Sequence, residues 1–197
     1  LGRILALVLR HAPEKFNVEM DINGWVNTRE LSDSISKQRK RYHWLRGWHF
    51  SAIANADEKG RYQVEGEMIR ATYGHSIELE LDLPTDDIPE GLYWPCEEDQ
   101  VETIMELGIT AGDRKHVHLS KTIVKAMEAG RVRIHRPAIL EVDTTRAIAD
   151  GHIIYRAGKT VFLIDEVPGE YLYRVEADDP IISEIVAQWE VEEAEEE

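Results

Sequence analysis

DINGWVNTRELSDSI, residues 21–35, is the stretch that decides the fold of the first half of the chain. Asn23-Gly24 is a turn signal, and Trp25-Val26 is long enough for only a short extended piece. Asn27 and Glu30 then stand at the spacing of a capping box, which starts a helix. The stretch therefore predicts a turn, a short strand and a helix, in that order.

Helix and hairpin patterns flank this stretch on both sides. Before it, apolar residues at the spacing of one helix face predict an amphipathic helix that Pro13 ends, with the stripe Leu1, Ile4, Leu5, Val8 and Leu9. After it, residues 45–57 predict a third helix, and residues 61–71 predict a β-hairpin. Helix, short strand, two helices and a hairpin is the order of a winged helix.

The second half of the chain has a different character. Helices are predicted at residues 97–108, 121–130 and 144–151. Single strands are predicted at 116–120, 138–145 and 170–176, and a hairpin of two strands at 152–168. We therefore predict an α+β chain with a winged-helix lobe (1–80), a linker (81–90), a β-rich lobe (91–180) and an acidic tail (181–197). Residues 190–197, EVEEAEEE, are expected to be solvated and frayed.

Composition excludes several classes of protein. A chain of 197 residues with 43% hydrophobic residues can bury a sizeable core, and no stretch is apolar enough to span a membrane. The apolar opening lacks the features of a secretory signal. A single cysteine excludes a disulfide framework. We expect a cytoplasmic monomer without a membrane partner.

Charge is spread unevenly over the chain. The net charge is −15, but residues 1–75 hold 12 Lys and Arg against 9 Asp and Glu, which gives +3. The remaining residues hold 11 against 29, which gives −18, and the two sum to −15. A mildly basic first half can therefore meet a nucleic acid although the whole chain is acidic.

Three short segments combine arginine with histidine and serine. They are LVLRH (7–11), IRATYGHS (69–76) and RKHVHLS (114–120). Each segment also has a purely structural interpretation, because cations stabilise the C-terminal end of a helix and polar residues are common in turns. His116 and His118 could also share a zinc ion, but no acidic or cysteine ligand nearby completes that site. Together the three arginines favour binding or transfer of a phosphate, with a histidine moving a proton.

SKQRKRYHWLRGWHF, residues 36–50, mixes basic and aromatic residues. Cations attract a phosphate backbone and aromatic rings stack on bases, so Arg39, Lys40 and Arg41 are candidates for contact with RNA. The alternative is a solvated basic loop before a helix whose tryptophans belong to the core. We expect at least one of Trp44 and Trp48 to be buried.

The order of six motifs resembles the RNA 2′-phosphotransferase family (Tpt1/KptA). Besides the three segments above, they are DINGWV (21–26), AILEVD (138–143) and VFLIDEVP (161–168). The resemblance implies a winged-helix lobe joined to a lobe of the ADP-ribosyltransferase type. It also implies an NAD-dependent enzyme that removes an internal RNA 2′-phosphate, of the kind left at a tRNA splice junction. An RNA-2′-phospho-ADP-ribose intermediate would form with loss of nicotinamide, and ADP-ribose 1″,2″-cyclic phosphate would be released.

The resemblance also assigns roles to residues. The catalytic set of the family falls on Arg10, His11, Arg70 and Arg114, with Arg70 expected to be exposed. Contacts with NAD would come from His75, Ser76, His118 and Ser120. The family usually has His-Gly-Thr where this chain has Trp94-Pro95-Cys96. Either Trp94 stacks on NAD in place of the imidazole, or NAD binds weakly, or the pocket of this chain is adjusted in another way. No metal is implied.

Two alternatives to this function are open. A relative could transfer ADP-ribose to a terminal phosphate of RNA or DNA and stop at that product. A winged-helix protein could also bind nucleic acid without catalysis, its second lobe having lost NAD together with His-Gly-Thr. Retention of Arg10, His11, Arg70 and Arg114 argues against that loss, because an inactive pocket has no need of so many phosphate-directed cations.

Overall fold

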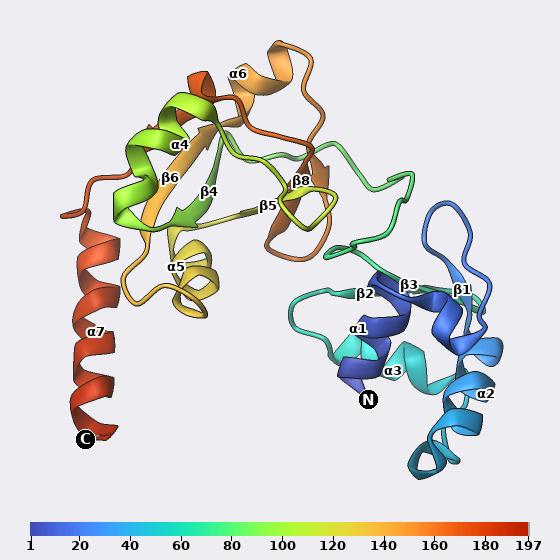
Figure 1. Ribbon diagram of the computed structural model, residues 1–197. Helices are drawn as coiled ribbons and strands as arrows, with labels where there is room; N and C mark the ends of the chain where they lie inside the picture. The colour runs from blue at the N-terminus through green and yellow to red at the C-terminus, as the bar shows by residue number, and fades with distance from the viewer. Residues whose placement is uncertain (197) are drawn as a thin grey trace. The chain divides into compact units, whose positions relative to one another are not determined.

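The computed structural model describes residues 1–196, and the chain divides into two compact units (Figure 1). The first unit contains Leu1–Pro84 and two later segments, Gly112–His116 and Tyr155–Lys159. The second contains Thr85–Ala111, Val117–Ile154 and the chain from Thr160 onward. The first unit therefore takes in two segments that lie within the stretch predicted as the β-rich lobe.

The first unit has the predicted order of elements. Its helices are α1 (Gly2–Arg10), α2 (Thr28–Gln38) and α3 (His49–Ala56), with short 3₁₀ turns at Pro13–Phe16 and Lys40–Tyr42. Its strands β1 (Val26–Asn27), β2 (Tyr62–Glu65) and β3 (Met68–Ala71) form an antiparallel sheet in the order β1-β3-β2. Buried side chains of the three helices and β1 and β3 make one core, which includes Leu5, Leu9, Val26, Leu31, Ile35, Phe50 and Ile69.

The amino end of α2 shows half of the predicted capping box. The Asn27 side chain accepts hydrogen bonds from the Arg29 and Glu30 backbone nitrogens, at 3.0 and 3.1 Å. The Glu30 carboxylate accepts instead from the Glu19 backbone nitrogen at 3.0 Å. Glu30 thereby ties the preceding loop to the helix that Asn27 starts.

The third helix is shorter than predicted, and the expectation of a buried tryptophan there is wrong. Helix α3 begins at His49, and turns lie at residues 43–44 and 47–48. Leu45 and Phe50 fill the core from this region, at 1% and 0% exposure. Trp44 and Trp48 remain 46% and 70% exposed, because these two apolar anchors already occupy the available space.

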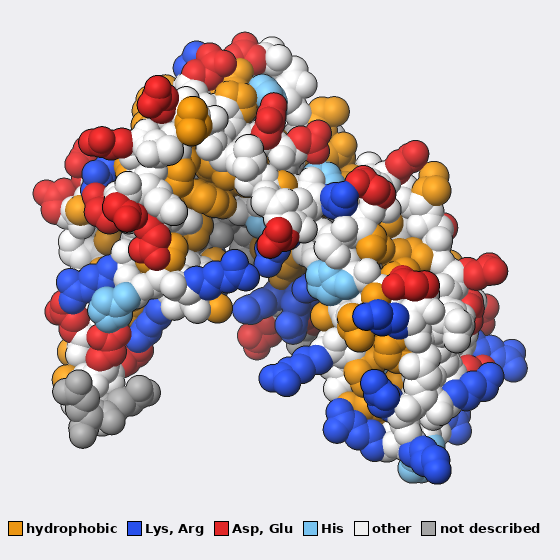
Figure 2. Space-filling view, in the orientation of Figure 1, with side chains coloured by type: hydrophobic (Ala, Val, Ile, Leu, Met, Phe, Trp, Pro, Cys, Tyr) orange, Lys and Arg blue, Asp and Glu red, His pale blue; other side chains and the backbone are white. Residues whose placement is uncertain are grey.

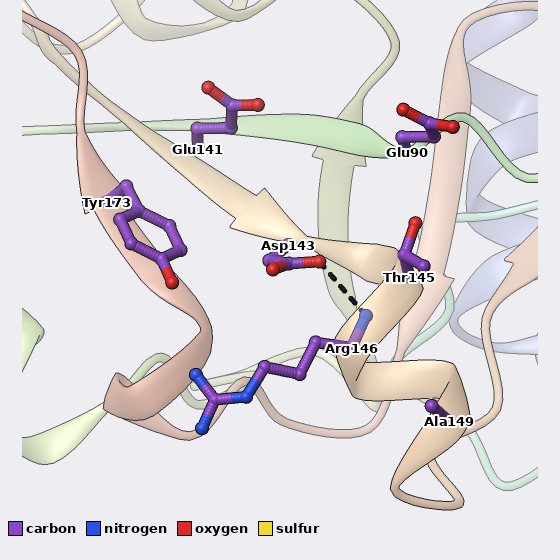
Figure 3. A pocket seen from close by; sticks show the side chains of 7 residues that line it. All are labelled: Glu90, Glu141, Asp143, Thr145, Arg146, Ala149 and Tyr173. Carbon is purple, nitrogen blue, oxygen red and sulfur yellow. Dashed lines mark hydrogen bonds between the residues drawn. The ribbon is translucent and has the colours of Figure 1, made fainter.

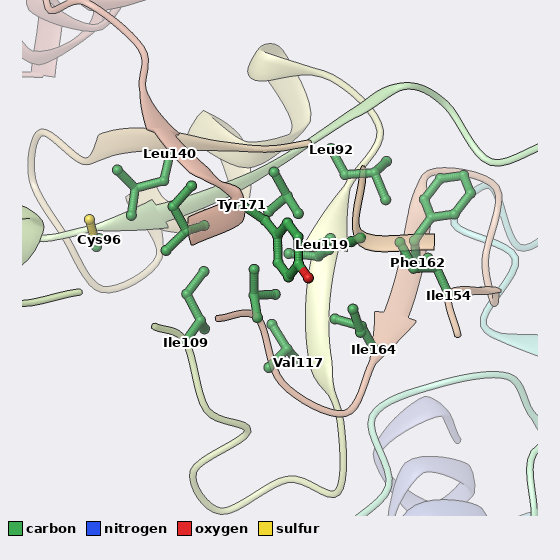
Figure 4. Packing of buried hydrophobic residues seen from close by; sticks show 14 of the residues in the cluster. Leu92, Cys96, Ile109, Val117, Leu119, Leu140, Ile154, Phe162, Ile164 and Tyr171 are labelled. Carbon is green, nitrogen blue, oxygen red and sulfur yellow. The ribbon is translucent and has the colours of Figure 1, made fainter. Parts of the chain in front are cut away.

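The larger sheet has the order β7-β8-β5-β4-β6-β9, and all of its strands except β7 (Tyr155–Arg156) belong to the second unit. The strands of the second unit are β4 (Gly91–Cys96), β5 (Val117–Ser120), β6 (Ala138–Asp143), β8 (Val161–Ile164) and β9 (Leu172–Arg174), and its helices are α4 (Val101–Leu107), α5 (Ile123–Arg131), α6 (Thr144–Ala149) and α7 (Pro180–Glu196). Figure 4 shows the apolar side chains that pack on one face, among them Leu92, Val117, Leu119, Leu140 and Phe162. The α+β prediction is confirmed.

Helix α7 extends through Glu196, so the prediction that residues 190–197 are frayed is wrong for the part that the structure describes. Ile182 and Trp189 lie seven residues apart on one helix face and pack with Ala126 and Met127 of α5. The acidic residues 190–195 are exposed, as expected of a solvated run. Glu197 lies outside the described residues. None of the described helices is long and apolar enough to cross a membrane.

Candidate active site

Arg10 is the last residue of α1 and the centre of a cationic cluster in the first unit. Its Nε and Nη2 atoms are buried and have no hydrogen-bond partner among residues 1–196. Its guanidinium carbon lies 5.2 Å from the centre of the Tyr73 ring. A buried guanidinium with two unpaired donors is costly, so this group is prepared for an acceptor that the chain itself does not supply.

Gly74 allows the backbone to approach this guanidinium. Its φ of +89° is a left-handed value that side chains other than glycine rarely adopt. A Cβ atom at this position would lie 3.2 Å from Arg10 Nη1. The glycine of IRATYGHS is therefore required both by its turn and by the close contact with Arg10.

His11 and Ser76 fix the IRATYGHS segment to the end of α1. The His11 Nδ1 atom and the Ser76 hydroxyl are 2.9 Å apart. The Ser76 backbone nitrogen donates to the Arg10 carbonyl oxygen at 3.0 Å. Two of the segments predicted to carry chemistry, which are 65 residues apart, are thus brought together.

The Arg114 segment joins the same unit through its neighbour Lys115. The Lys115 backbone nitrogen donates to the His75 carbonyl oxygen at 3.2 Å, and its ammonium group pairs with Glu78. Desolvation lowers the pKa of His11, and the positive charges of Arg10 and then Arg114 lower it further. No carboxylate of residues 1–195 forms an ion pair with Arg10 or Arg114. The cluster therefore has an excess of positive charge and suits a phosphate.

The pKa values of the residues in the cluster reflect the same excess of positive charge. Burial lowers the pKa of Arg10, and Arg61 and then Arg114 contribute further to the decrease. Desolvation, followed by Arg10 and Arg114, lowers the pKa of His11. Desolvation and the neighbouring cations, chiefly Arg10, lower the pKa of His75 to about 4. Both imidazoles are therefore neutral near pH 7 and able to accept a proton.

Burial of neutral His75 should make the protein less stable as the pH falls. In the unfolded chain this imidazole takes up a proton near its ordinary pKa of about 6.5, whereas in the folded protein it does so only near 4. The unfolded state therefore binds more protons between these values, and stability falls by about 2 kcal/mol from about pH 7 to about pH 5. Urea unfolding of the wild type and His75→Gln across this range checks the prediction. Parallel curves for the two proteins would contradict it.

Arg70 lies near His75 but is engaged elsewhere, and the expectation that it is exposed is wrong. It is 6% exposed, and its guanidinium carbon lies 4.3 Å from the centre of the Trp25 ring. Its Nε donates to the Gln63 side chain at 2.9 Å, and its Nη1 pairs with the Asp82 carboxylate. Arg70 is the third strongest candidate for contact with phosphate, because Asp82 already neutralises part of its charge.

Comparison with known proteins agrees with the motifs. The family model described as RNA 2'-phosphotransferase, Tpt1 / KptA family, matches residues 1–166. The chain is 39% identical over 178 residues to Probable RNA 2'-phosphotransferase 1 of Archaeoglobus fulgidus, covering 88% of this chain and 79% of the relative. It is 40% identical over 176 residues to a protein with the name Probable RNA 2'-phosphotransferase from Methanosarcina acetivorans, covering 89% and 83%. A protein of the same name from Fusobacterium nucleatum is 36% identical over 174 residues, covering 87% and 96%.

The chain belongs to the RNA 2′-phosphotransferase family. The resemblance drawn from the six motifs is therefore confirmed. Helix α7 lies beyond residues 1–166, so the family match does not extend to the segment that ends the second core.

In this member of the RNA 2′-phosphotransferase family, His118 and Ser120 of β5 lie on the face of the sheet opposite to Trp94 of β4. Tyr93 of β4 pairs with Ser120, so the two residues share a face of the sheet, and His118 shares it by alternation. Trp94 lies on the other face and packs against the apolar core that contains Val117 and Leu119. The structure thus does not bring Trp94 together with His118 and Ser120.

Strands β4 and β5 separate directly after this pair. In the described residues their register is limited to Tyr93 and Ser120, whereas β5 pairs with β8 over its whole length. Continuing the register would place Pro95 opposite His118, and proline has no N–H to donate. The ladder therefore opens beside the HVHLS motif. Cys96 is buried, and burial raises the pKa of its thiol to about 11, so it is no nucleophile.

A hollow in the second unit is unsuited to a phosphate. It has a volume of about 750 Å³, and Figure 3 shows carboxylates of Glu90, Glu141 and Asp143 around it, with Arg146 as its one arginine. Asp143 accepts from the Arg146 backbone nitrogen at 2.9 Å, which caps α6. None of the residues predicted to be catalytic or to bind NAD or RNA lines this hollow.

Two residues that contact Arg10 are absent from the site residues predicted from the sequence. Gly74 and Tyr73 both contact the Arg10 guanidinium. The glycine within a polar turn gave a signal for Gly74, since such a residue marks a positive φ or a close approach. Tyr73 gave none, because an aromatic residue after a strand is an ordinary feature.

Proposed function

We propose that the protein removes an internal 2′-phosphate from RNA and transfers it to NAD. The observation that carries this proposal is the Arg10 guanidinium, whose buried Nε and Nη2 have no partner in the described residues and whose pKa is lowered by burial and by further arginines, Arg61 and Arg114. An anion with several oxygens fits such a group, since a planar guanidinium donates two parallel hydrogen bonds. The names and sequences of the relatives support a 2′-phosphate as that anion.

The residues of the cluster suit the two steps of this transfer. Arg10 and Arg114 would orient the phosphate first and then stabilise the charge that develops when it is attacked. His11 has a lowered pKa and is held by Ser76, so it can accept a proton from a hydroxyl and pass it to the leaving 2′-oxygen. Arg70 would assist if phosphate displaced Asp82 from its guanidinium.

NAD as co-substrate is compatible with the residues present. Its pyrophosphate is anionic and suits a cluster with an excess of arginine. The Nε2 atom of His75 is buried and has no hydrogen-bond partner among residues 1–196, so it can bond to a polar ligand group. His75, Ser76, His118 and Ser120 are the proposed contacts, and Trp94 is not retained among them. When bound, NAD supplies the ribose carbon that receives the phosphate, with nicotinamide as the leaving group.

The finer description of the fold belongs to the same proposal. The order of elements in the first unit supports a winged helix, and the six-stranded antiparallel sheet supports a lobe of the ADP-ribosyltransferase type. A role in tRNA splicing would follow from the position of the 2′-phosphate in the substrate.

The test is incubation with a short RNA that carries one internal 2′-phosphate, with and without NAD⁺. We expect NAD-dependent loss of the phosphate, with ADP-ribose cyclic phosphate and nicotinamide as products resolved by mass. Accumulation of RNA joined to ADP-ribose would indicate an enzyme that stops after the first step. An RNA that keeps its phosphate in the presence of NAD⁺ would contradict the proposal.

A further inference from the structure

Residues 34–56 form a basic and aromatic surface in the first unit. They contain five Lys and Arg and no Asp or Glu, in a chain with 38 acidic residues. Figure 2 shows Lys and Arg side chains gathered at the lower end of this unit, near the end of α2 in Figure 1. We call this surface the aromatic patch and define it by Arg39, Lys40, Arg41, Trp44, Trp48 and His49.

The cations of the patch lack counter-ions. Among the side chains of residues 1–195, no carboxylate forms an ion pair with any Lys or Arg of residues 34–56. In the second unit, by contrast, Arg131, Arg136 and Arg174 each pair with a glutamate. Like charges held together repel, and an exposed cluster of this kind attracts a polyanion.

The aromatic rings of the patch are exposed and fixed in place. Trp48 is 70% exposed and stacks on His49, with ring centres 3.6 Å apart. Trp44 meets His49 edge to face at 5.1 Å. Backbone oxygens hold the loop, since Trp44 Nε1 donates to the Arg41 carbonyl at 3.0 Å and Arg46 Nη1 to the His43 carbonyl at 2.8 Å. The rings are therefore arranged in advance for a flat ligand, at little entropic cost.

Tyr42 places the patch at the opposite end of α1 from Arg10. The Leu1 nitrogen lies 2.8 Å from the Tyr42 hydroxyl, and the Tyr42 ring contacts Trp44 with centres 6.2 Å apart. At about 1.5 Å per residue, α1 rises roughly 13 Å from Leu1, which contacts Tyr42, to Arg10. A stacked strand advances about 3.4 Å per nucleotide, so this distance corresponds to about four nucleotides.

We propose that the aromatic patch binds unpaired nucleotides of the RNA substrate, about four or more nucleotides from the 2′-phosphate. Trp48, Trp44 and His49 stack on bases, while Arg39, Lys40 and Arg41 contact the phosphate backbone. The combination of exposed rings with uncompensated cations favours single-stranded RNA over a protein partner. This inference rests on the proposed function, which supplies RNA as the ligand.

The test measures binding of RNA without a 2′-phosphate and without NAD, so it does not depend on turnover. We expect Trp48→Ala to weaken binding of an unstructured 12-nucleotide RNA by about tenfold, the order of one lost base stack, and to change binding of a 12-base-pair duplex much less. Ile22→Ala, which removes another exposed apolar side chain of the same unit, should leave both affinities unchanged. Because Trp48 is exposed, thermal unfolding of the variant should match the wild type.

Charge and length provide two further readouts. Arg39→Gln combined with Lys40→Gln should lower the dependence of log affinity on log salt by about 0.7 for each lost contact, whereas Lys125→Gln in α5 should not. With RNAs that carry a 2′-phosphate, affinity should rise once the strand extends about four nucleotides beyond it, and Trp48→Ala should remove that rise.

Two results would overturn this inference. One is wild-type affinity of Trp48→Ala for the single-stranded RNA. The other is self-association of the wild type that Trp48→Ala abolishes while RNA affinity stays unchanged, which would assign the patch to a protein partner. An inactive enzyme that still binds single-stranded RNA through Trp48 would instead refute the proposed reaction and leave the patch intact.

Discussion

Arg10→Met should lower the rate of 2′-phosphate removal by about a thousandfold, the order of loss when one preorganised donor to a developing charge is removed. The Arg10 guanidinium is buried with two unpaired nitrogens and no carboxylate partner in the described chain, so it contributes to ligand binding and not to folding. The free energy of unfolding should therefore stay the same or rise, since a repulsive buried charge is replaced by an apolar side chain of similar length. Single-turnover kinetics and urea unfolding measure the two quantities.

Two variants sharpen this prediction. Arg3→Ala removes an exposed arginine from the same helix and should leave the rate unchanged. Arg10→Lys keeps the charge but loses the planar pair of donors, so it should restore only part of the rate. A variant Arg10→Met that is as active as the wild type, or one that fails to fold, would remove Arg10 from the role assigned to it.

Trp189→Ala should destabilise the protein by about 3–5 kcal/mol, the usual range when a large aromatic side chain is removed from a core. Trp189 is 9% exposed in a cluster with Ala126, Met127 and Ile139, and the Arg131 guanidinium carbon lies 4.5 Å from the centre of its ring. Helix α7 holds this residue, so its loss should also release the end of the chain. Urea unfolding gives the free energy, and hydrogen exchange of α7 amides reports the release.

Trp48→Ala is the matched control for stability. The same side chain is removed, but Trp48 is 70% exposed, so the cost should stay below about 0.5 kcal/mol. Equal stability of the two variants would mean that α7 does not belong to the core and that the frayed tail expected from the sequence is the better description.

Local signals in the sequence were sufficient for most elements. Asn27 was predicted as the cap of α2 and forms both capping hydrogen bonds. Gly108 was predicted as the end of α4 and caps it with a φ of +87°. Such features depend on backbone geometry within a few residues, so they can be recognised without the fold.

Predictions failed where the burial of a residue depends on contacts with residues far away in the sequence. Trp44 and Trp48 looked like core residues by spacing, but Leu45 and Phe50 fill that space. Conversely, the acidic composition of residues 190–197 obscured the apolar face of α7, on which Ile182 and Trp189 lie. Arg70 shows the same limit, because its partner Asp82 is 12 residues away in a segment predicted as a linker. Only the folded structure shows which of these contacts form.

The most direct test of the account compares two short RNAs that differ only in one internal 2′-phosphate, bound to the wild type without NAD. If the Arg10 cluster captures that phosphate, the phosphorylated RNA should bind at least about tenfold more tightly, the order of a charge-assisted hydrogen bond, and Arg10→Met should remove the difference. Equal affinity of the wild type for the two RNAs would show that the cluster is not a 2′-phosphate site and would contradict the account.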